Sequence, residues 1–216
     1  MTPTYPPPLA GVRDLFYRHW MLACPPMAAV IGAVLLSSPP AELALTLVWL
    51  QFVVYLLHES EEHVWPGGFK DYVNARVVGP ALHARYPGAT VPDHDFPLDD
   101  RAVFWINISF VWVAFPLFAV LAGTVDMRFG LLPPWLGIVN ASVHILTAIL
   151  KRGYNPGLLV SICLNIPTGI WTLWVLGAAG AGVGAQLLGL GVAVIGHLAL
   201  IASLVPRMRR VVAASG

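Results

Sequence analysis

The sequence predicts an all-α fold, a polytopic membrane bundle of six transmembrane helices with both termini in the cytoplasm. Two observations predict it. Hydrophobic residues make up 57% of the 216 residues and charged residues only 11%, whereas a soluble domain carries about 25% charged residues. Six stretches are also apolar over most of the roughly 20 residues that a membrane-spanning helix needs. The composition therefore excludes an ordinary soluble domain, and the net charge of +1 gives no reason to expect a nucleic acid partner.

The six predicted spans follow one another with one long interruption, and residues 1–216 are expected to form a single membrane-embedded domain. Pro25 and Pro26 interrupt the first stretch, which lacks the small-residue cleavage site of a signal peptide. Only residues 37–40 separate it from the second, so these two are expected to form a helical hairpin. The spans are expected at Trp20–Leu36, Ala41–Leu57, Ala102–Ala122, Leu131–Leu150, Leu158–Leu176 and Ala181–Val205.

The basic residues orient this bundle. If the N-terminus lies in the cytoplasm, the cytoplasmic segments hold all but one of the 12 lysines and arginines, and only Arg128 lies outside. Short cytoplasmic segments of membrane proteins are enriched in Lys and Arg. We therefore expect an integral membrane protein whose two termini and long loop face the cytoplasm. The cytoplasmic basic residues are Arg13, Arg18, Lys70, Arg76, Arg85, Arg101, Lys151, Arg152, Arg207, Arg209 and Arg210.

The one long loop, at about residues 64–101, is predicted to be cytoplasmic. Pro66-Gly67-Gly68 ends the second span. Phe69, Tyr72, Val73 and Val77 then recur at helical spacing, which predicts a short helix on the membrane surface. The acidic stretch that follows has two interpretations, a second metal site or a solvated loop whose last Asp caps the third span. It comprises Asp93, His94, Asp95, Asp99 and Asp100.

Ionisable residues cluster at the end of the second span, from His58 to His63. At 100° per residue, His58, Glu61 and Glu62 share one helix face about 100° wide. Glu59 and His63 fall on the adjacent face. One imidazole and two carboxylates on one face could form half of a site for iron, zinc or manganese. The alternative is a charged helix end at the membrane interface.

Polar residues in the other spans are predicted to complete this site. Asn140 and His144 are four residues apart in the fourth span, hence on one face, and Lys151 lies on nearly the same stripe. Ionisable residues inside spans are costly and mark functional sites. Asn107 and Asn140, with Asn165 of the fifth span, are expected to hydrogen-bond to ligands, cofactor or substrate, because amides are weak ligands for these metals.

The depth of these residues favours one common site. At 1.5 Å per residue from the cytoplasmic ends, Asn107 lies about 9 Å deep, His144 about 10 Å, Asn165 about 12 Å and His197 about 13 Å. His197 has no polar side-chain neighbour in its own helix, so its partner is expected to come from another span. The predicted metal ligands are His58, Glu61, Glu62, His144 and His197.

Three motifs resemble those of the HXXEE family of bacterial membrane proteins. They are His58-x-x-Glu61-Glu62 followed by Trp65-Pro66-Gly67-Gly68-Phe69, then Asn140-x-x-x-His144, then Tyr154-Asn155-Pro156-Gly157. The resemblance covers about residues 45–205 and implies a multi-span helical protein that is suspected to be an enzyme. It also implies an integral protein of the bacterial inner (cytoplasmic) membrane. It implies no substrate and no reaction.

The last motif also has a structural interpretation. Asn155 can cap the fifth span, and Pro156 suits its first turn. Tyr154, near Lys151, can instead face the entrance of the site as an acid or as a substrate contact.

Three classes of function are compatible with this pattern. The favoured one is a metal-dependent enzyme that acts on a lipophilic small molecule in the membrane. Its expected partners are this substrate and the membrane lipids. A divalent transition metal would be held by His and Glu, and Glu61, Glu62, Lys151 and Tyr154 are the candidate catalytic residues. Iron, and oxidation by dioxygen, is favoured over zinc and hydrolysis, and manganese is possible.

Two alternatives need no bound metal. A metal-free isomerase or cyclase could use a buried Glu as a proton donor. A transporter or channel for protons or metal ions is disfavoured, because no polar residues continue from the site to the outer side and no inverted repeat is visible.

Overall fold

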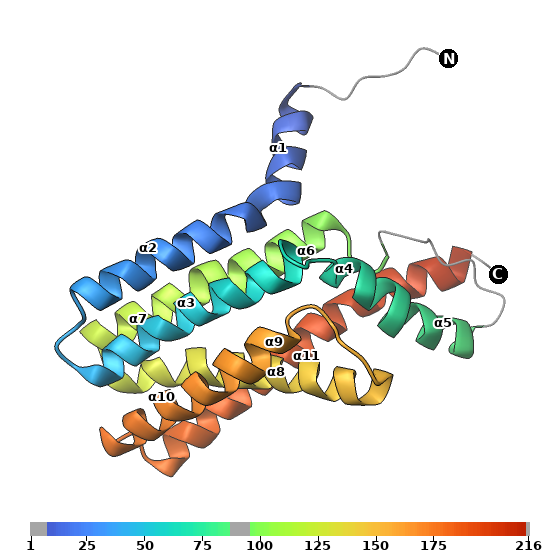
Figure 1. Ribbon diagram of the computed structural model, residues 1–216. Coiled ribbons are helices and arrows are strands. Elements are labelled where there is room, and N and C mark those ends of the chain that lie inside the picture. The colour runs from blue at the N-terminus through green and yellow to red at the C-terminus, as the bar shows by residue number, and fades with distance from the viewer. Residues whose placement is uncertain (1–7, 87–95, 215–216) are drawn as a thin grey trace.

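The computed structural model describes residues 8–86 and 96–214, most of which are helical, with no strand among them (Figure 1). Within these residues, six helices are long and apolar enough to cross a membrane. The predicted all-α fold of six membrane spans is thereby confirmed, and the protein is embedded in a membrane. The spans are Gly11–Ser37, Leu43–His63, Asp100–Thr124, Met127–Lys151, Leu158–Ala178 and Val183–Arg209.

The first span changes helix type in its middle. Helix α1 (Pro8–His19) leads into a 3-10 turn, η1 (Trp20–Ala23), and then into α2 (Cys24–Ser37). The prolines at the start of α2 lack the N–H groups that would continue a helix from α1. Figure 1 shows α1 turned away from the line of α2. The prediction missed α1 because its charged residues make it less apolar than a span.

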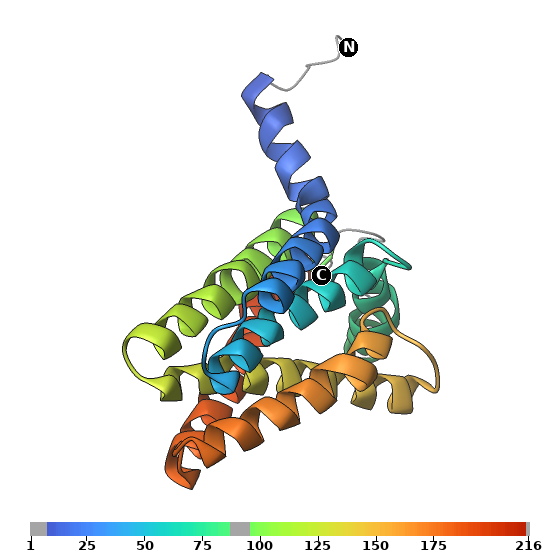
Figure 2. The same ribbon diagram turned by 60° about the vertical axis from the view of Figure 1, so that its left-hand side comes forward.

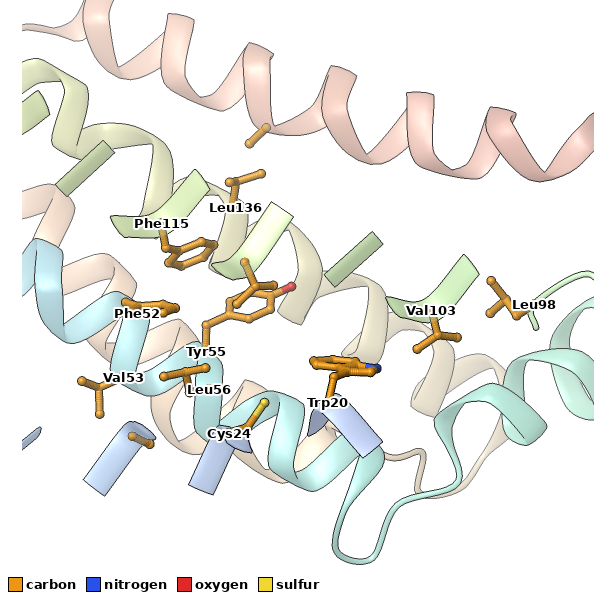
Figure 3. Close-up of a cluster of buried hydrophobic side chains, with 13 residues drawn as sticks. Trp20, Cys24, Phe52, Val53, Tyr55, Leu56, Leu98, Val103, Phe115 and Leu136 are labelled. Carbon is orange, nitrogen blue, oxygen red and sulfur yellow. The ribbon is translucent and has the colours of Figure 1, made fainter. Parts of the chain in front are cut away.

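The second span, α3 (Leu43–His63), packs against α2, α7, α8 and α10. It runs six residues beyond its predicted end at Leu57, so the stretch from His58 to His63 is helical. A buried apolar cluster holds this helix in place (Figure 3). In it the ring of Tyr55 lies 4.8 Å from that of Phe115 on α7. Trp20 and Cys24 cover the other side.

The remaining spans carry short irregular turns. π-helical turns, here η3 and η5, often mark functional sites. The third span is α6 (Asp100–Asn107), η3 (Ile108–Val113) and α7 (Ala114–Thr124). The fourth is a 3-10 turn, η4 (Met127–Leu131), and α8 (Leu132–Lys151). The fifth is α9 (Leu158–Val160), η5 (Ser161–Asn165) and α10 (Ile166–Ala178), and the sixth lies in α11 (Val183–Ala214).

The segment after the second span forms the predicted short helix. It consists of α4 (Phe69–Tyr72), a π-helical turn η2 (Val73–Val78) and α5 (Gly79–Arg85). The side chain of Asn74 ties it to the chain before α6, because it donates to the carbonyl of Leu98 at 2.9 Å and accepts from the N–H of Leu98 at 3.1 Å.

The acidic stretch before α6 does not supply the expected cap from its last residue. Asp99 caps α6 by accepting the N–H of Ala102 at 2.7 Å, whereas Asp100 accepts from Lys70 at 2.6 Å. The shift by one residue places Asp100 beside α4. Asp93, His94 and Asp95 lie outside the described residues, so a metal site there stays a prediction.

Both described ends of the chain lie at the same end of the bundle. Figures 1 and 2 show the start of α1, the α4–α5 segment and the end of α11 at one end. The short turns after α2, α7 and α10 lie at the other. Which end faces the cytoplasm stays a prediction from the basic residues.

Cysteine labelling in intact cells tests this orientation. Ala84→Cys on α5 and Val125→Cys in the turn after α7 occupy exposed positions at opposite ends. In a background without Cys24 and Cys163, the cysteine at 125 should react with an impermeant maleimide. The one at 84 should react only after the membrane is permeabilised. The reverse pattern would invert the predicted topology.

Candidate metal centre

The end of α3 buries its ionisable side chains. His58 and Glu59 are 0% exposed, Glu61 6% and Glu62 5%. A charged helix end that is exposed to solvent would not show this burial. Buried ionised groups are stable only when partners compensate the lost hydration. The partners of each carboxylate therefore decide what this cluster can do.

The first group joins α3 to α8. The Oε1 atom of Glu62 lies 3.0 Å from Nε2 of His144 and 3.5 Å from Nε2 of His58. Asn140, one turn before His144, places its Nδ2 atom 2.8 Å from Nε2 of His58. The structure thus brings together four residues that the sequence analysis assigned to one site. In this arrangement the lone pair of His58 Nε2 accepts the Asn140 amide, and a metal would compete for that lone pair.

Asn155 orients His144. Its Nδ2 donates to the backbone carbonyl of His144 at 2.9 Å, so its Oδ1 faces the imidazole, 2.7 Å from Nδ1. An amide oxygen can only accept, so Nδ1 carries the proton and Nε2 of the neutral ring keeps a free lone pair. Metal-binding histidines commonly donate their second N–H in this way. The structural interpretation expected the Asn155 side chain to cap the fifth span. The side chain binds His144 instead, so that expectation is wrong.

The surroundings of Gly157 explain why the same motif ends in glycine. Its φ is +94°, and a Cβ built there would lie 2.7 Å from Cε1 of His58, 2.8 Å from Cε1 of His144 and 2.9 Å from Cγ of Glu62. Such distances are far inside van der Waals contact. The backbone at 157 therefore closes over the group, and only a residue without a side chain fits.

A second group lies on the other side of Glu62. Nε2 of His63 is 3.3 Å from Oε2 of Glu59 and 3.5 Å from Oε2 of Glu62. The side-chain nitrogen of Asn107 lies 3.3 Å from the same Nε2. Glu59 and His63 were left outside the predicted ligand set, although their spacing of four residues was a usable signal. Glu62 reaches both groups because its face adjoins that of His63.

Both groups have the composition and spacing of a metal site. In each, one ligand atom per residue lies within 4.8 Å of the others. Two ligands about 2.0–2.2 Å from one metal, at 90–110°, are about 2.8–3.6 Å apart. All four distances from the imidazoles to Glu59 and Glu62 fall in this range. The clusters could therefore hold a metal ion.

Three buried atoms in these groups lack a hydrogen-bond partner. They are Nδ1 of His58 and both carboxylate oxygens of Glu59. Buried polar atoms are rarely left unpaired, and an unpaired one often marks a site for an ion or water.

Glu61 is not in either group. Its Oε1 accepts from the Tyr154 hydroxyl at 2.8 Å and the Leu159 N–H at 3.0 Å, and its Oε2 accepts from the Val160 N–H at 2.7 Å. A carboxylate at a helix N-terminus is stabilised by the free N–H groups and the helix dipole. Glu61 thus anchors the start of the fifth span instead of facing His58.

Tyr154 contacts Glu61 and lies outside both groups. Partial burial and the hydrogen bond to the Glu61 carboxylate raise the pKa of its phenol well above the ordinary value. At neutral pH Tyr154 is therefore a hydrogen-bond donor that holds Glu61, and this contact adds to the anchoring of the fifth span.

The structure does not bring the other predicted site residues into the groups. His197 places Nδ1 2.9 Å from the carbonyl of Ala193, one turn back in its own helix. The expectation that its partner must come from another span overlooked this backbone acceptor. Asn165 is buried, its Oδ1 close to Gly137 on α8, and Lys151 is exposed at the end of α8.

A cavity of about 280 Å³ adjoins the first group. Most of its wall is apolar and comes mainly from η2, α6, η3, α8 and α11. Its polar wall includes Glu62, His144, Asn140, Asn107 and His197. Polar residues from five spans were predicted to share one site, and residues from four of these spans line this cavity. His197 faces the cavity but belongs to neither ligand group.

A smaller cavity of about 160 Å³ reaches His63 from the end of the bundle, past Lys70, Asp71 and Asp100. Phe69 lines both cavities, and its ring centroid lies 5.7 Å from that of His63 and 5.7 Å from that of His144. Phe69 therefore stands between an apolar space and a polar one.

The fold and the buried groups define a polytopic helical membrane protein with histidine–carboxylate clusters that could hold a metal. The chain belongs to the family described as "Protein of unknown function with HXXEE motif", whose sequence profile matches residues 49–172, more than half of the chain. This confirms the resemblance, and the match contains every member of both groups. No curated protein and no solved structure matches the chain.

Proposed function

We propose that the protein is a metal-dependent membrane enzyme that oxidises a lipophilic small molecule at a non-haem iron held by His58, Glu62 and His144. The observation that carries this proposal is the ligand set. Two imidazoles and one carboxylate with open positions are the set used by non-haem iron oxygenases. Zinc hydrolases use a similar set, and manganese accepts the same donors, so the metal itself is a point for experiment.

The shape of the cavity supports a lipophilic substrate. Val143 and Ile201 line it and are 47% and 55% exposed, so it opens on the outer surface of α8 and α11. Val143 lies eight residues from the end of α8, about 12 Å along the helix. That surface would face the acyl chains of the bilayer, and a substrate could enter sideways from the membrane. The basic residues favour an orientation in which the site lies towards the cytoplasm.

The reaction class follows from the substrate and the metal. Oxidation of a C–H bond by dioxygen follows R–H + O₂ + 2 e⁻ + 2 H⁺ → R–OH + H₂O, with the two electrons from a reduced electron carrier. Iron would supply the activation of dioxygen. The chain itself orients His144 through Asn155 and presents Asn107, Asn140 and His197 to the polar part of a substrate.

Labelled dioxygen tests the proposal. The purified protein in lipid nanodiscs, freed of metal, would be loaded with Fe²⁺ or Zn²⁺ and given membrane-lipid extract, a reductant and isotopically labelled dioxygen. Iron-loaded wild type should form a labelled product detectable by mass spectrometry. His144→Ala should not, whereas His83→Ala, at an exposed histidine of α5, should match wild type.

Two results would contradict the proposal. Unlabelled hydrolysis products with Zn²⁺ alone would indicate a hydrolase. A product formed equally well by metal-free protein would indicate acid–base catalysis without a metal.

A further inference from the structure

We propose that the protein binds a second metal ion, at Glu59, Glu62 and His63, and that the Glu62 carboxylate bridges the two ions. This inference rests on the proposed first ion at His58, Glu62 and His144. It changes the centre from a mononuclear to a dinuclear one.

The orientation of Glu62 is the first observation. Its Oε1 atom faces the two imidazoles of the first group, at 3.0 Å and 3.5 Å, and its Oε2 atom faces His63 at 3.5 Å. A carboxylate that presents one oxygen to each of two ligand groups has the geometry of a bridging ligand. Helical bundles hold paired iron or manganese ions with Glu and His side chains that project inward from neighbouring helices.

The second observation is the buried carboxylate of Glu59, which accepts no hydrogen bond. This side chain is 0% exposed, and neither of its oxygens has a hydrogen-bond partner. Its ligand atom lies within 4.8 Å of those of Glu62 and His63. The contact of Oε2 with His63, at 3.3 Å, is longer than the roughly 2.7–2.9 Å of a charge-assisted hydrogen bond. A cation between the two ligands would satisfy both.

A route to the second group exists on the surface. The cavity of about 160 Å³ runs from Asp71 and Asp100 to His63. Lys70 also lines this cavity and pairs with Asp100 at 2.6 Å, so Asp71 is the carboxylate that would attract a divalent cation. Phe69 separates this route from the apolar cavity. Metal ions and lipophilic substrates would thus reach the centre from different sides. A metal site needs an entry path for the ion, and this cavity would provide one.

Iron counting tests the second ion without an assay of activity. Metal-free protein would be titrated with Fe²⁺ under anaerobic conditions, and bound iron per chain would be measured by elemental analysis. Wild type should bind two ions, and both Glu59→Gln and His63→Gln should bind one. Glu61→Gln, which alters the neighbouring carboxylate outside both groups, should still bind two.

Electron paramagnetic resonance gives an independent measure. After oxidation, the spins of two neighbouring ferric ions would couple, so wild type should show a much weaker signal of isolated ferric iron, per bound iron, than a protein with one ion. Glu59→Gln should show that signal at half the iron content. The melting temperature of each variant in nanodiscs would show that it is folded.

The outcomes separate the two proposals. One iron per chain in wild type, unchanged in Glu59→Gln, would overturn the second site and leave the first intact. A strong isolated ferric signal from fully loaded wild type would also overturn it. No bound iron, zinc or manganese in wild type would overturn both.

Discussion

Glu62→Gln should abolish tight metal binding, whereas Glu61→Gln should retain it. Glutamine keeps the shape of the side chain but removes the anionic oxygens, and Glu62 alone contributes to both ligand groups. Loss of a residue that merely supports a metal ligand costs about 10–100-fold in affinity, so loss of the shared ligand should cost at least about 100-fold. Metal content after dialysis against a weak chelator would measure this.

The adjacent residue provides a matched control. Glu61 binds the Tyr154 hydroxyl and two N–H groups at the start of the fifth span. Glu61→Gln should therefore lower stability, by about 1.5–3 kcal/mol as for hydrogen bonds to charged groups, with little change in metal content. If the two variants behaved in the reverse way, the assignment of both carboxylates would be wrong.

Gly157→Ala should disrupt the first ligand group. The added Cβ would lie 2.7–2.9 Å from atoms of His58, His144 and Glu62, so it would displace all three members of the first group. The positive φ of +94° adds strain of about 1–2 kcal/mol for a residue with a Cβ. We expect a large loss of metal affinity together with a lower melting temperature.

Gly180→Ala separates these two effects. Gly180 has a similar φ of +98°, but a Cβ there has no atom within 4 Å, and it lies between α10 and α11 at the other end of the bundle (Figure 1). It should lower the melting temperature through strain alone and leave metal content unchanged. Equal loss of metal in both glycine variants would show that global destabilisation, and not contact with the cluster, is the cause.

Composition and periodicity were sufficient for the fold. Six apolar stretches of membrane length determine six helices, because backbone groups in lipid must be paired within the helix. The geometry of one helix also placed His58 and Glu62 on a common face, and the same geometry placed Asn140 with His144. The estimated distances of these residues from the cytoplasmic ends of their spans then placed the two pairs at a similar level. These predictions succeeded because each depends on local helix geometry, which does not change with the surroundings.

The different roles of the neighbouring carboxylates Glu61 and Glu62 could not be predicted from helix geometry. Glu61 and Glu62 differ by 100° on the helix, and both fell within the predicted face. Glu61 turns to the start of the fifth span because the chain from Arg152 to Gly157 brings free N–H groups beside it. Glu59 and His63 lie on the side of α3 against which η1 and η3 pack, and the ring centroid of Trp20 in η1 lies 5.5 Å from that of His63.

Two further residues show the same limit. Asn155 was expected to cap the helix that follows it, but its side chain binds His144, 11 residues earlier in the chain. His197 was expected to depend on another span, but a carbonyl four residues back satisfies its Nδ1. The sequence alone determined which residues lie on which helix face and at which depth. Only the tertiary structure decided which carboxylate meets which imidazole, because those contacts depend on how loops and neighbouring helices pack and not on the period of any one helix.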